Sequence, residues 1–244
     1  SVGKTSALVA IGSGMAAYNE GELFHFSLEN TLNQMIRKYA SNLLSQPYLK
    51  ADEIRMGMES MRNSMSGNLH IECYAPGTVT TNFVQNRIER SMEDKKKKKV
   101  QGILLDYCSL FKSMLQRDAR HEQLANIIVE CKALATYFDC PVWTGAQPQR
   151  SPSKAVSEFK SGNGPVNVGC SFEAPVLTME DAGECWAYAQ VTDHMVTINQ
   201  NMEEKQSKVP SVRLFNAKSR EPRQDAPVNK TLECKFDYAT CTIF

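Results

Sequence analysis

The sequence predicts an α/β fold, in which a mostly parallel twisted sheet is flanked by helices and followed by a β-rich carboxyl-terminal tail. Two observations predict it. Strand-like runs alternate with helix-like runs over most of the 244 residues, which is typical of strand–helix–strand units. The run VQGILLDY at 100–107 is almost continuously apolar, as expected of a strand buried on both faces of a parallel sheet.

The elements of the first half follow from the spacing of their apolar residues. A small-residue helix is expected after Gly3-Lys4-Thr5, and then a short strand, ELFHFSL. Amphipathic helices are expected at NTLNQMIRKYASNLL and TTNFVQNRIERSM, with methionines at helical spacing between Ile54 and Met65. Between them, LHIECYA predicts a strand that ends at Pro76-Gly77.

The second half repeats this alternation. A helix is expected at HEQLANIIVECKALATYFD, a buried strand at CPVWTGAQ and a loop from Pro148 to about Gly169. A helix around Asp181–Val191, the strand HMVTINQ, a charged turn, the strand VRLFNAKS and the tail LECKFDYATCTIF complete the chain. Since neither a repeat nor a linker interrupts the pattern, we expect a single domain over residues 1–244.

Composition limits the classes of function. The net charge of +1 excludes a polyelectrolyte surface, so any contact with nucleic acid must come from a local patch. The eight scattered cysteines form no C-x-x-C pair, which favours buried thiols over a disulfide framework or a zinc site. The four histidines lack metal-ligand spacing, so no metal beyond Mg²⁺ is expected. With no apolar run of about 18 residues and no signal peptide, we expect a soluble, cytoplasmic protein without a membrane partner.

The first motif with chemical meaning is Gly3-Lys4-Thr5, followed by Ser6. In a phosphate-binding loop, G-x-x-x-x-G-K-[ST], backbone N–H groups cradle the phosphates, the lysine reaches the β- and γ-phosphates, and the hydroxyl holds Mg²⁺. Only x-x-G-K-T is present, so the chain is expected to begin within this loop. A G-K-T tripeptide alone is weak evidence for a phosphate-binding loop, but its place before a predicted helix strengthens this hypothesis.

Two carboxylates follow strands whose carboxyl ends are expected at the same edge of the sheet. Asp106 ends VQGILLDY, as in a Walker B strand, where it can hold the Mg²⁺ shell together with Thr5. Glu29 follows FHFSL and can polarise the attacking water. The alternatives are a turn-capping aspartate and a glutamate that stabilises the amino terminus of the next helix.

Three further residues at strand ends are candidates for catalysis. Gln147 ends CPVWTGAQ and can sense the γ-phosphate, although it also fits the start of a polar loop. Lys218 and Arg220 close VRLFNAKSR. Such cations are usually solvated, but in a ring ATPase they can reach a neighbour's nucleotide.

Two basic segments are candidates for DNA binding. The loop after Gln147 carries Arg150, Lys154 and Lys160 and little aromatic surface, so it is expected to contact the DNA backbone. The run Lys95–Lys99 precedes a strand, so we expect it at the amino edge of the sheet as a solvated loop.

In order, GKT, FSLEN, LLDY, TGAQPQR and NAKSR resemble the successive motifs of DnaB-like replicative helicases of bacteria and tailed phages. AGECWAYAQVTDHMVTINQNMEE and YAPGTVT resemble further family segments, so the resemblance spans roughly Ser1 to Asp225. The chain departs from the family at His25, where an apolar residue or tyrosine is commoner, and at Glu221-Pro222-Arg223, where a glycine is common.

The resemblance implies a RecA-like motor that uses ATP and Mg²⁺. It implies a hexameric ring around single-stranded DNA, 5′-to-3′ movement, and a primase and a helicase loader as possible partners, in a bacterial cytoplasm or in a phage-infected one. Gly3, Lys4, Thr5 and Ser6 then bind phosphate and Mg²⁺ with Asp106. Glu29 becomes the base, Gln147 the sensor, and Lys218 and Arg220 the cations that act in trans.

Two alternatives within the same fold stay open. One is a recombinase-like or clock-type ATPase that forms filaments or rings without unwinding DNA. The other is a non-catalytic module that builds a ring. TGAQPQR and the K-x-R strand end favour the helicase over an ATPase that does not unwind DNA. A non-catalytic module is disfavoured, because the chain retains Lys4, Glu29, Asp106 and Arg220 together.

Overall fold

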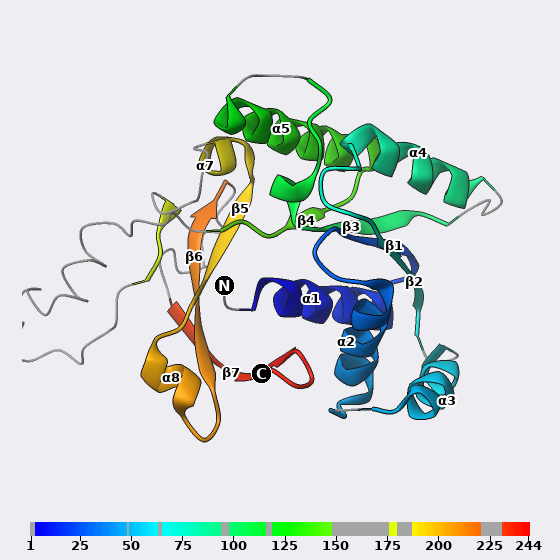
Figure 1. Cartoon of the computed structure of the whole chain (residues 1–244), viewed down its shortest axis with the longest axis vertical. Coiled ribbons are helices and arrows are strands. Elements are labelled where there is room, and N and C mark those ends of the chain that lie inside the picture. The colour runs from blue at the N-terminus through cyan, green and yellow to red at the C-terminus, as the bar shows by residue number, and fades with distance from the viewer. Residues whose placement is uncertain are drawn as a thin grey trace, which may run out of the picture. The chain divides into compact units, whose positions relative to one another are not determined.

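The computed structural model of the chain describes residues 3–47, 49–62, 65–93, 98–115, 119–147, 176–179, 187–220 and 231–244 (Figure 1). The described residues fall into two compact units. The amino-terminal unit comprises Gly3–Ala146 and Asp237–Ile243. The carboxyl-terminal unit comprises the described parts of Gln147–Phe236, with Phe244.

The amino-terminal unit is built on a parallel sheet with the strand order β2-β1-β3-β4. Its strands are β1 (Gly21–Ser27), β2 (Gly67–Cys73), β3 (Val100–Asp106) and β4 (Val142–Thr144). In the register of the two central strands, Ser27 lies opposite Asp106. The last residues of β1 and β3 therefore meet at one edge, where Asp106 ends β3 and the loop that carries Glu29 leaves β1.

Helices cover both faces of this sheet. In Figure 1, α1 (Lys4–Tyr18) and α2 (Leu32–Leu44) lie on one side of it, and α4 (Thr81–Met92) and α5 (Arg120–Phe138) lie on the other. The short 3-10 helix η1 (Cys108–Leu110) follows β3, and α3 (Ala51–Arg62) packs against α2. The helices bury the strands so completely that five of the seven β3 residues are consecutive buried positions. This explains the apolar run by which β3 is predicted.

The start of α2 is fixed locally. Thr31 accepts a hydrogen bond from the Gln34 backbone N–H, while the Gln34 side chain accepts one from the Thr31 backbone N–H. This capping box satisfies two amide groups that a helix start otherwise leaves without partners. The turn that carries Glu29 therefore ends at a defined residue.

The last residues of the chain complete the amino-terminal unit. The Asn42 side-chain amide donates to the backbone carbonyls of Thr240 and Cys241, at 3.1 and 3.0 Å. Cys241 also joins a buried cluster with Met35 and Tyr39. The segment Asp237–Ile243, which includes β8 (Thr242–Ile243), thus packs against α2 although it lies about 200 residues away in sequence.

The strands of the carboxyl-terminal unit are antiparallel. Here α7 (Ala187–Val191) precedes β5 (His194–Asn199), α8 (Met202–Gln206), β6 (Ser211–Ser219) and β7 (Thr231–Asp237). Strand β6 pairs with both β5 and β7. The link between β5 and β6 is too short for the crossover that a parallel pair requires. It contains α8 rather than only a charged turn, because Asn201 and Glu204 form a second capping box.

Most predicted elements are confirmed, with differences at their ends. Strand β4 is shorter than CPVWTGAQ suggested, and α7 begins later than predicted, since residues 180–186 lie outside the described ranges. Burial of the thiols is confirmed for five of the six described cysteines, Cys73 being the partly exposed one. None of the described helices is long and apolar enough to cross a membrane.

Candidate nucleotide-binding site

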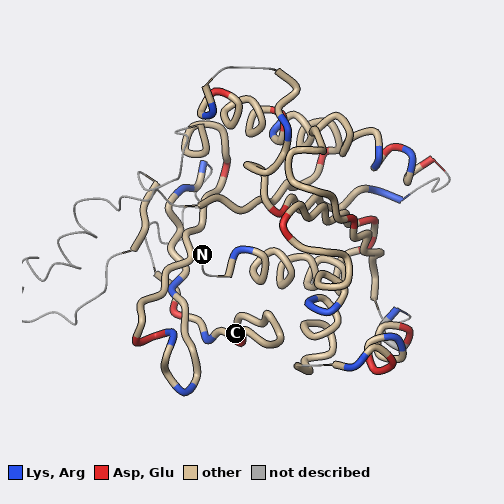
Figure 2. Tube along the Cα trace, viewed as in Figure 1, with Lys and Arg blue, Asp and Glu red and all other residues tan. Residues whose placement is uncertain are grey.

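The first turn of α1 has the form of an anion-binding helix start. Gly3 precedes the helix with φ 68°, a left-handed conformation that suits glycine, and no side chain caps the backbone amides that follow. The first turn contains no acidic residue and holds Lys4, Thr5 and Ser6. In Figure 2 the helix is basic at its start and uncharged along the rest of its length. The partial positive charge of the helix start is thus reinforced by a lysine.

The Lys4 ammonium group is buried and has no hydrogen-bond partner among the described residues. It lies 4.1 Å from the centre of the Tyr107 ring, a cation–π contact. The aliphatic part of the Lys4 side chain packs against Gly145, which directly follows β4. A Cβ added at Gly145 would lie 3.2 Å from Lys4 Cδ. Burial lowers the pKa of Lys4, while the charges of Glu29 and Asp106 oppose that shift.

Asp106 is fully buried at the end of β3. The Thr5 hydroxyl donates to its carboxylate, at 3.2 Å to Oδ1 and 3.0 Å to Oδ2. Ser27 Oγ and Asn30 Nδ2 each donate to Oδ2, at 3.2 Å. Burial raises the pKa of Asp106, the Thr5 and Ser27 hydrogen bonds lower it, and the Glu29 charge raises it further.

Glu29 is exposed beside this cluster, at the rim of an open cavity of about 660 Å³. The turn after β1 and the segment after β2 line the cavity, together with Tyr107 and Leu110. Glu29 and Tyr107 line the same cavity, and the Lys4 ammonium group lies over the Tyr107 ring. Asn30, the residue after Glu29, bonds Asp106, so all three charged groups belong to one site. The predicted convergence of Lys4, Thr5, Glu29 and Asp106 at one edge of the sheet is thus present in the structure.

These residues fit a magnesium-bound polyphosphate. A buried ammonium group without an acceptor and a helix start without a cap both suit phosphate oxygens. The Thr5 hydroxyl and the Asp106 carboxylate, in mutual contact, supply the hard oxygen ligands that Mg²⁺ prefers.

Four residues of the site were missed by sequence reasoning. Ser27 and Asn30 bond Asp106, while Tyr107 and Gly145 flank Lys4. Ser27 and Asn30 bracket Glu29 within FSLEN, and Tyr107 directly follows Asp106. Their proximity to the predicted carboxylates was the available signal. The sequence contains no signal for the contact between Gly145 and Lys4, since this contact depends on tertiary packing.

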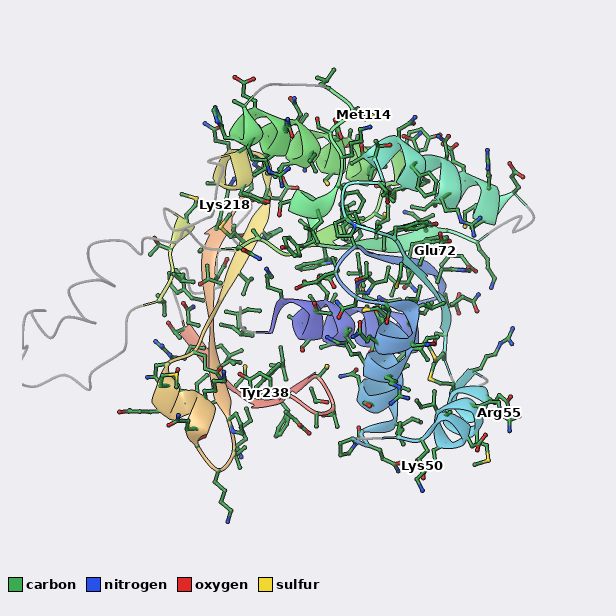
Figure 3. The ribbon with its side chains drawn as sticks, viewed as in Figure 1. Lys50, Arg55, Glu72, Met114, Lys218 and Tyr238 are labelled. Atoms are coloured by element: carbon green, nitrogen blue, oxygen red, sulfur yellow. The ribbon has the colours of Figure 1, made fainter. Side chains whose placement is uncertain are left out.

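Three further predicted residues belong to the other unit. Gln147, Lys218 and Arg220 fall in the carboxyl-terminal unit. Lys218, labelled on β6 in Figure 3, donates to the backbone carbonyls of Ala189, Gln190 and Thr192, around the end of α7. Arg220 donates to the same Gln190 carbonyl and pairs with Asp193 at 3.2 Å. Within their own unit, both cations therefore fasten the turn between α7 and β5.

Most of the candidates for DNA binding lie outside the residues that the structure describes. Arg150, Lys154 and Lys160 lie outside the described residues, as do Lys95–Lys97. Lys98 pairs with Glu22 at 3.2 Å and Lys99 with Asp139 at 2.7 Å. The described end of the lysine run thus lies at the amino edge of the sheet, as predicted.

His25, one of the departures from the helicase family, has a structural explanation. It is fully buried in β1, and its Nδ1 lies 2.6 Å from the Tyr39 hydroxyl. Burial lowers the pKa of His25 to about 3, with a further contribution from the charge of Lys38. The imidazole is therefore neutral and shares a hydrogen bond between β1 and α2.

Comparison with known proteins places this chain in a family. The family described as DnaB-like helicase C terminal domain matches residues 1–158. A search of curated protein sequences finds no significant match. Among solved structures, a DnaB-like replicative helicase, studied with its interactions with primase, matches with a TM-score of 0.72 and 20% identity. It covers 100% of this chain, which spans only 56% of the length of that protein.

A second solved structure, of an ATPase domain, matches with a TM-score of 0.71 and 19% identity, over 100% of this chain and 80% of that one. These similarities confirm the predicted fold class: a RecA-like domain with a parallel sheet between helices and a β-rich carboxyl-terminal part. Because the family match covers more than half of the sequence, this chain belongs to the DnaB-like helicase C-terminal domains.

Proposed function

We propose that this chain is the ATP-hydrolysing motor domain of a replicative DNA helicase that moves 5′ to 3′ along single-stranded DNA. The observation that carries the proposal is the meeting of Lys4, Thr5, Glu29 and Asp106 at the carboxyl edge of one sheet. The family match and the folds of the structural neighbours support it.

Each residue of the cluster has a distinct task in this proposal. Lys4 and the amides of the first α1 turn bind the β- and γ-phosphates, which supplies the acceptor that the buried ammonium group lacks. Thr5 and Asp106 hold Mg²⁺, which neutralises phosphate charge when bound. Glu29, exposed at the cavity, accepts a proton from the attacking water.

The other predicted residues complete the proposal. Gln147 senses the γ-phosphate, and Lys218 and Arg220 stabilise charge at a neighbouring subunit's nucleotide. For these two cations the proposal requires that they leave the carbonyl groups of α7, to which they are bonded here. Arg150, Lys154 and Lys160 contact the DNA backbone. The assembly is a homo-oligomeric ring, expected to be hexameric, with a primase and a helicase loader as further partners.

The decisive experiment measures ATP hydrolysis and fork unwinding. It uses the chain with a complete phosphate-binding loop ahead of Gly3, with and without single-stranded DNA. We expect DNA to stimulate hydrolysis and Lys4→Ala to lower kcat by roughly 100-fold or more. Glu29→Gln should lower kcat by about 100-fold to 10 000-fold and retain nucleotide binding. Lys50→Ala and Glu59→Gln, at exposed positions of the same unit, are matched controls.

The results separate the alternatives. Stimulated hydrolysis without displacement of a 5′-tailed fork would indicate a ring or filament ATPase that does not unwind DNA. Absence of turnover, with assembly intact, would indicate a non-catalytic ring module. Full activity of Lys4→Ala would refute the nucleotide site itself.

A further inference from the structure

Asn30 forms part of a closed ring of hydrogen bonds at the predicted metal carboxylate. Its backbone N–H donates to Ser27 Oγ at 3.2 Å, and Ser27 Oγ donates to Asp106 Oδ2 at 3.2 Å. The Asn30 side-chain amide donates to the same Oδ2, also at 3.2 Å. Backbone bonding adds a further link, since the Leu28 N–H donates to the Asp106 carbonyl at 2.8 Å.

The ring leaves the two Asp106 oxygens unequal. Oδ2 accepts from Thr5, Ser27 and Asn30, whereas among the described residues Oδ1 accepts from Thr5 alone. Hydrogen bonds from fixed donors hold a carboxylate in one rotamer and favour its ionised form. A carboxylate held in this way through one oxygen presents the other in a defined direction.

The ring also fixes the turn that carries Glu29. Ser27 and Asn30 flank Leu28 and Glu29, so both ends of this short segment are tied to Asp106. The position of the Glu29 backbone relative to the metal carboxylate is thereby set before any ligand arrives.

A purely structural role for Asn30 in starting α2 does not account for these bonds. The helix start is satisfied by the Thr31–Gln34 capping box, without the Asn30 side chain. Asn33, in the first turn of the same helix, is exposed and offers a comparison residue of the same type.

We infer that Asn30, acting with Ser27, is a positioning residue that orients Asp106 for Mg²⁺ and locks the Glu29 turn to it. The inference rests on the proposed function, since it assumes that Asp106 holds the metal of a nucleotide. It assigns metal positioning to a side chain outside the phosphate-binding loop and outside the two catalytic carboxylates.

The test compares Asn30→Ala with Asn33→Ala in the complete protein. Calorimetric titration of ADP is run with Mg²⁺ and with EDTA, and hydrolysis is followed against Mg²⁺ concentration. We expect Asn30→Ala to weaken Mg²⁺-dependent ADP binding and to raise the half-saturating Mg²⁺ concentration, each about 10-fold. Metal-free ADP affinity and KM for ATP should stay within about 2-fold, and Asn33→Ala should match the unsubstituted protein.

A double-mutant cycle with Ser27→Ala provides a second measurement. Because both residues act through one ring, the loss in the double variant should be less than the product of the single losses. Equal Mg²⁺ dependence in Asn30→Ala and Asn33→Ala would overturn the inference while leaving the proposed function intact. An equal loss of affinity with and without Mg²⁺ would also overturn it, because it would indicate a structural role. If the unsubstituted protein binds no nucleotide, the proposed function fails and the inference fails with it.

Discussion

Gly12 marks the place where α1 approaches the buried side chain of Tyr39 on α2. A Cβ added at Gly12 would lie 2.3 Å from Tyr39 Oη and 2.7 Å from Leu104 Cδ1. The Tyr39 hydroxyl cannot simply withdraw, because the side chain is fully buried and bonded to His25 Nδ1 at 2.6 Å. Substitution of Gly12 by alanine therefore forces the α1–α2 packing or the Tyr39–His25 bond to change.

The expected change in the free energy of unfolding on Gly12→Ala follows from three contributions. Overpacking a close-packed site costs about 1 to 3 kcal/mol. Displacing a buried hydroxyl from its hydrogen bond costs about 1 to 3 kcal/mol more. Alanine regains about 1 kcal/mol over glycine in a helix interior. We expect Gly12→Ala to lower the free energy of unfolding by about 3 kcal/mol, whereas Gly14→Ala, with nothing within 4 Å of the added Cβ, should raise it by up to about 1 kcal/mol.

Urea denaturation followed by far-ultraviolet circular dichroism measures both variants on the same chain. Tyr39→Phe in the Gly12→Ala background removes the clashing hydroxyl. Tyr39→Phe should therefore lower the free energy of unfolding less in that background than in the unsubstituted chain. Equal stability of Gly12→Ala and Gly14→Ala would show that α1 and α2 are not held at this separation, and the reasoning would be wrong.

Three further predictions concern the same unit. Because the pKa of His25 falls from 6.5 in the unfolded chain to about 3 in the folded one, only the unfolded chain takes up this proton between these values. The free energy of unfolding should therefore decline as the pH falls from 6.5 toward 3, by up to about 5 kcal/mol. Urea denaturation midpoints measured across this pH range should show the decline in the control variant His121→Gln and lose it in His25→Leu. Asn42→Asp places a carboxylate against the Thr240 and Cys241 carbonyls, so it should cost about 3 kcal/mol and expose the segment Asp237–Ile243 to limited proteolysis. Burial raises the pKa of the Cys131 thiol, so peptide mapping after alkylation at pH 8 should find it modified only once the chain is unfolded.

Much of the amino-terminal unit could be predicted because its signals are local. The apolar run of β3 reports burial on both faces, and the spacing within α2 reports one buried face. The positions of Glu29 and Asp106 follow from a general property of parallel sheets, whose strands end at one edge. The predictions for these residues needed only correct identification of the two strands.

What could not be predicted depends on contacts between distant segments. Nothing near Asn42 in sequence indicates that residues 240 and 241 lie beside it. The place of Asn30 beside Glu29 indicates that it lies near the site, but not that its side chain bonds Asp106. The antiparallel pairing of β5, β6 and β7 was likewise hidden, since apolar alternation does not report strand direction. Register and long-range pairing are properties of the packed chain.

The two ends of the parallel sheet show how the candidate site differs from an ordinary buried polar cluster. At the amino end, the fully buried Glu22 is paired with His70, Asn68 and Lys98. At the carboxyl end, the Lys4 ammonium group is buried without a hydrogen-bond acceptor among the described residues. The same fold therefore satisfies one buried charge and leaves the other unsatisfied, at a cost in stability. Since the charge left without an acceptor lies at the uncapped start of α1, beside Thr5 and Asp106, we propose a phosphate-bearing ligand as the partner that offsets this cost.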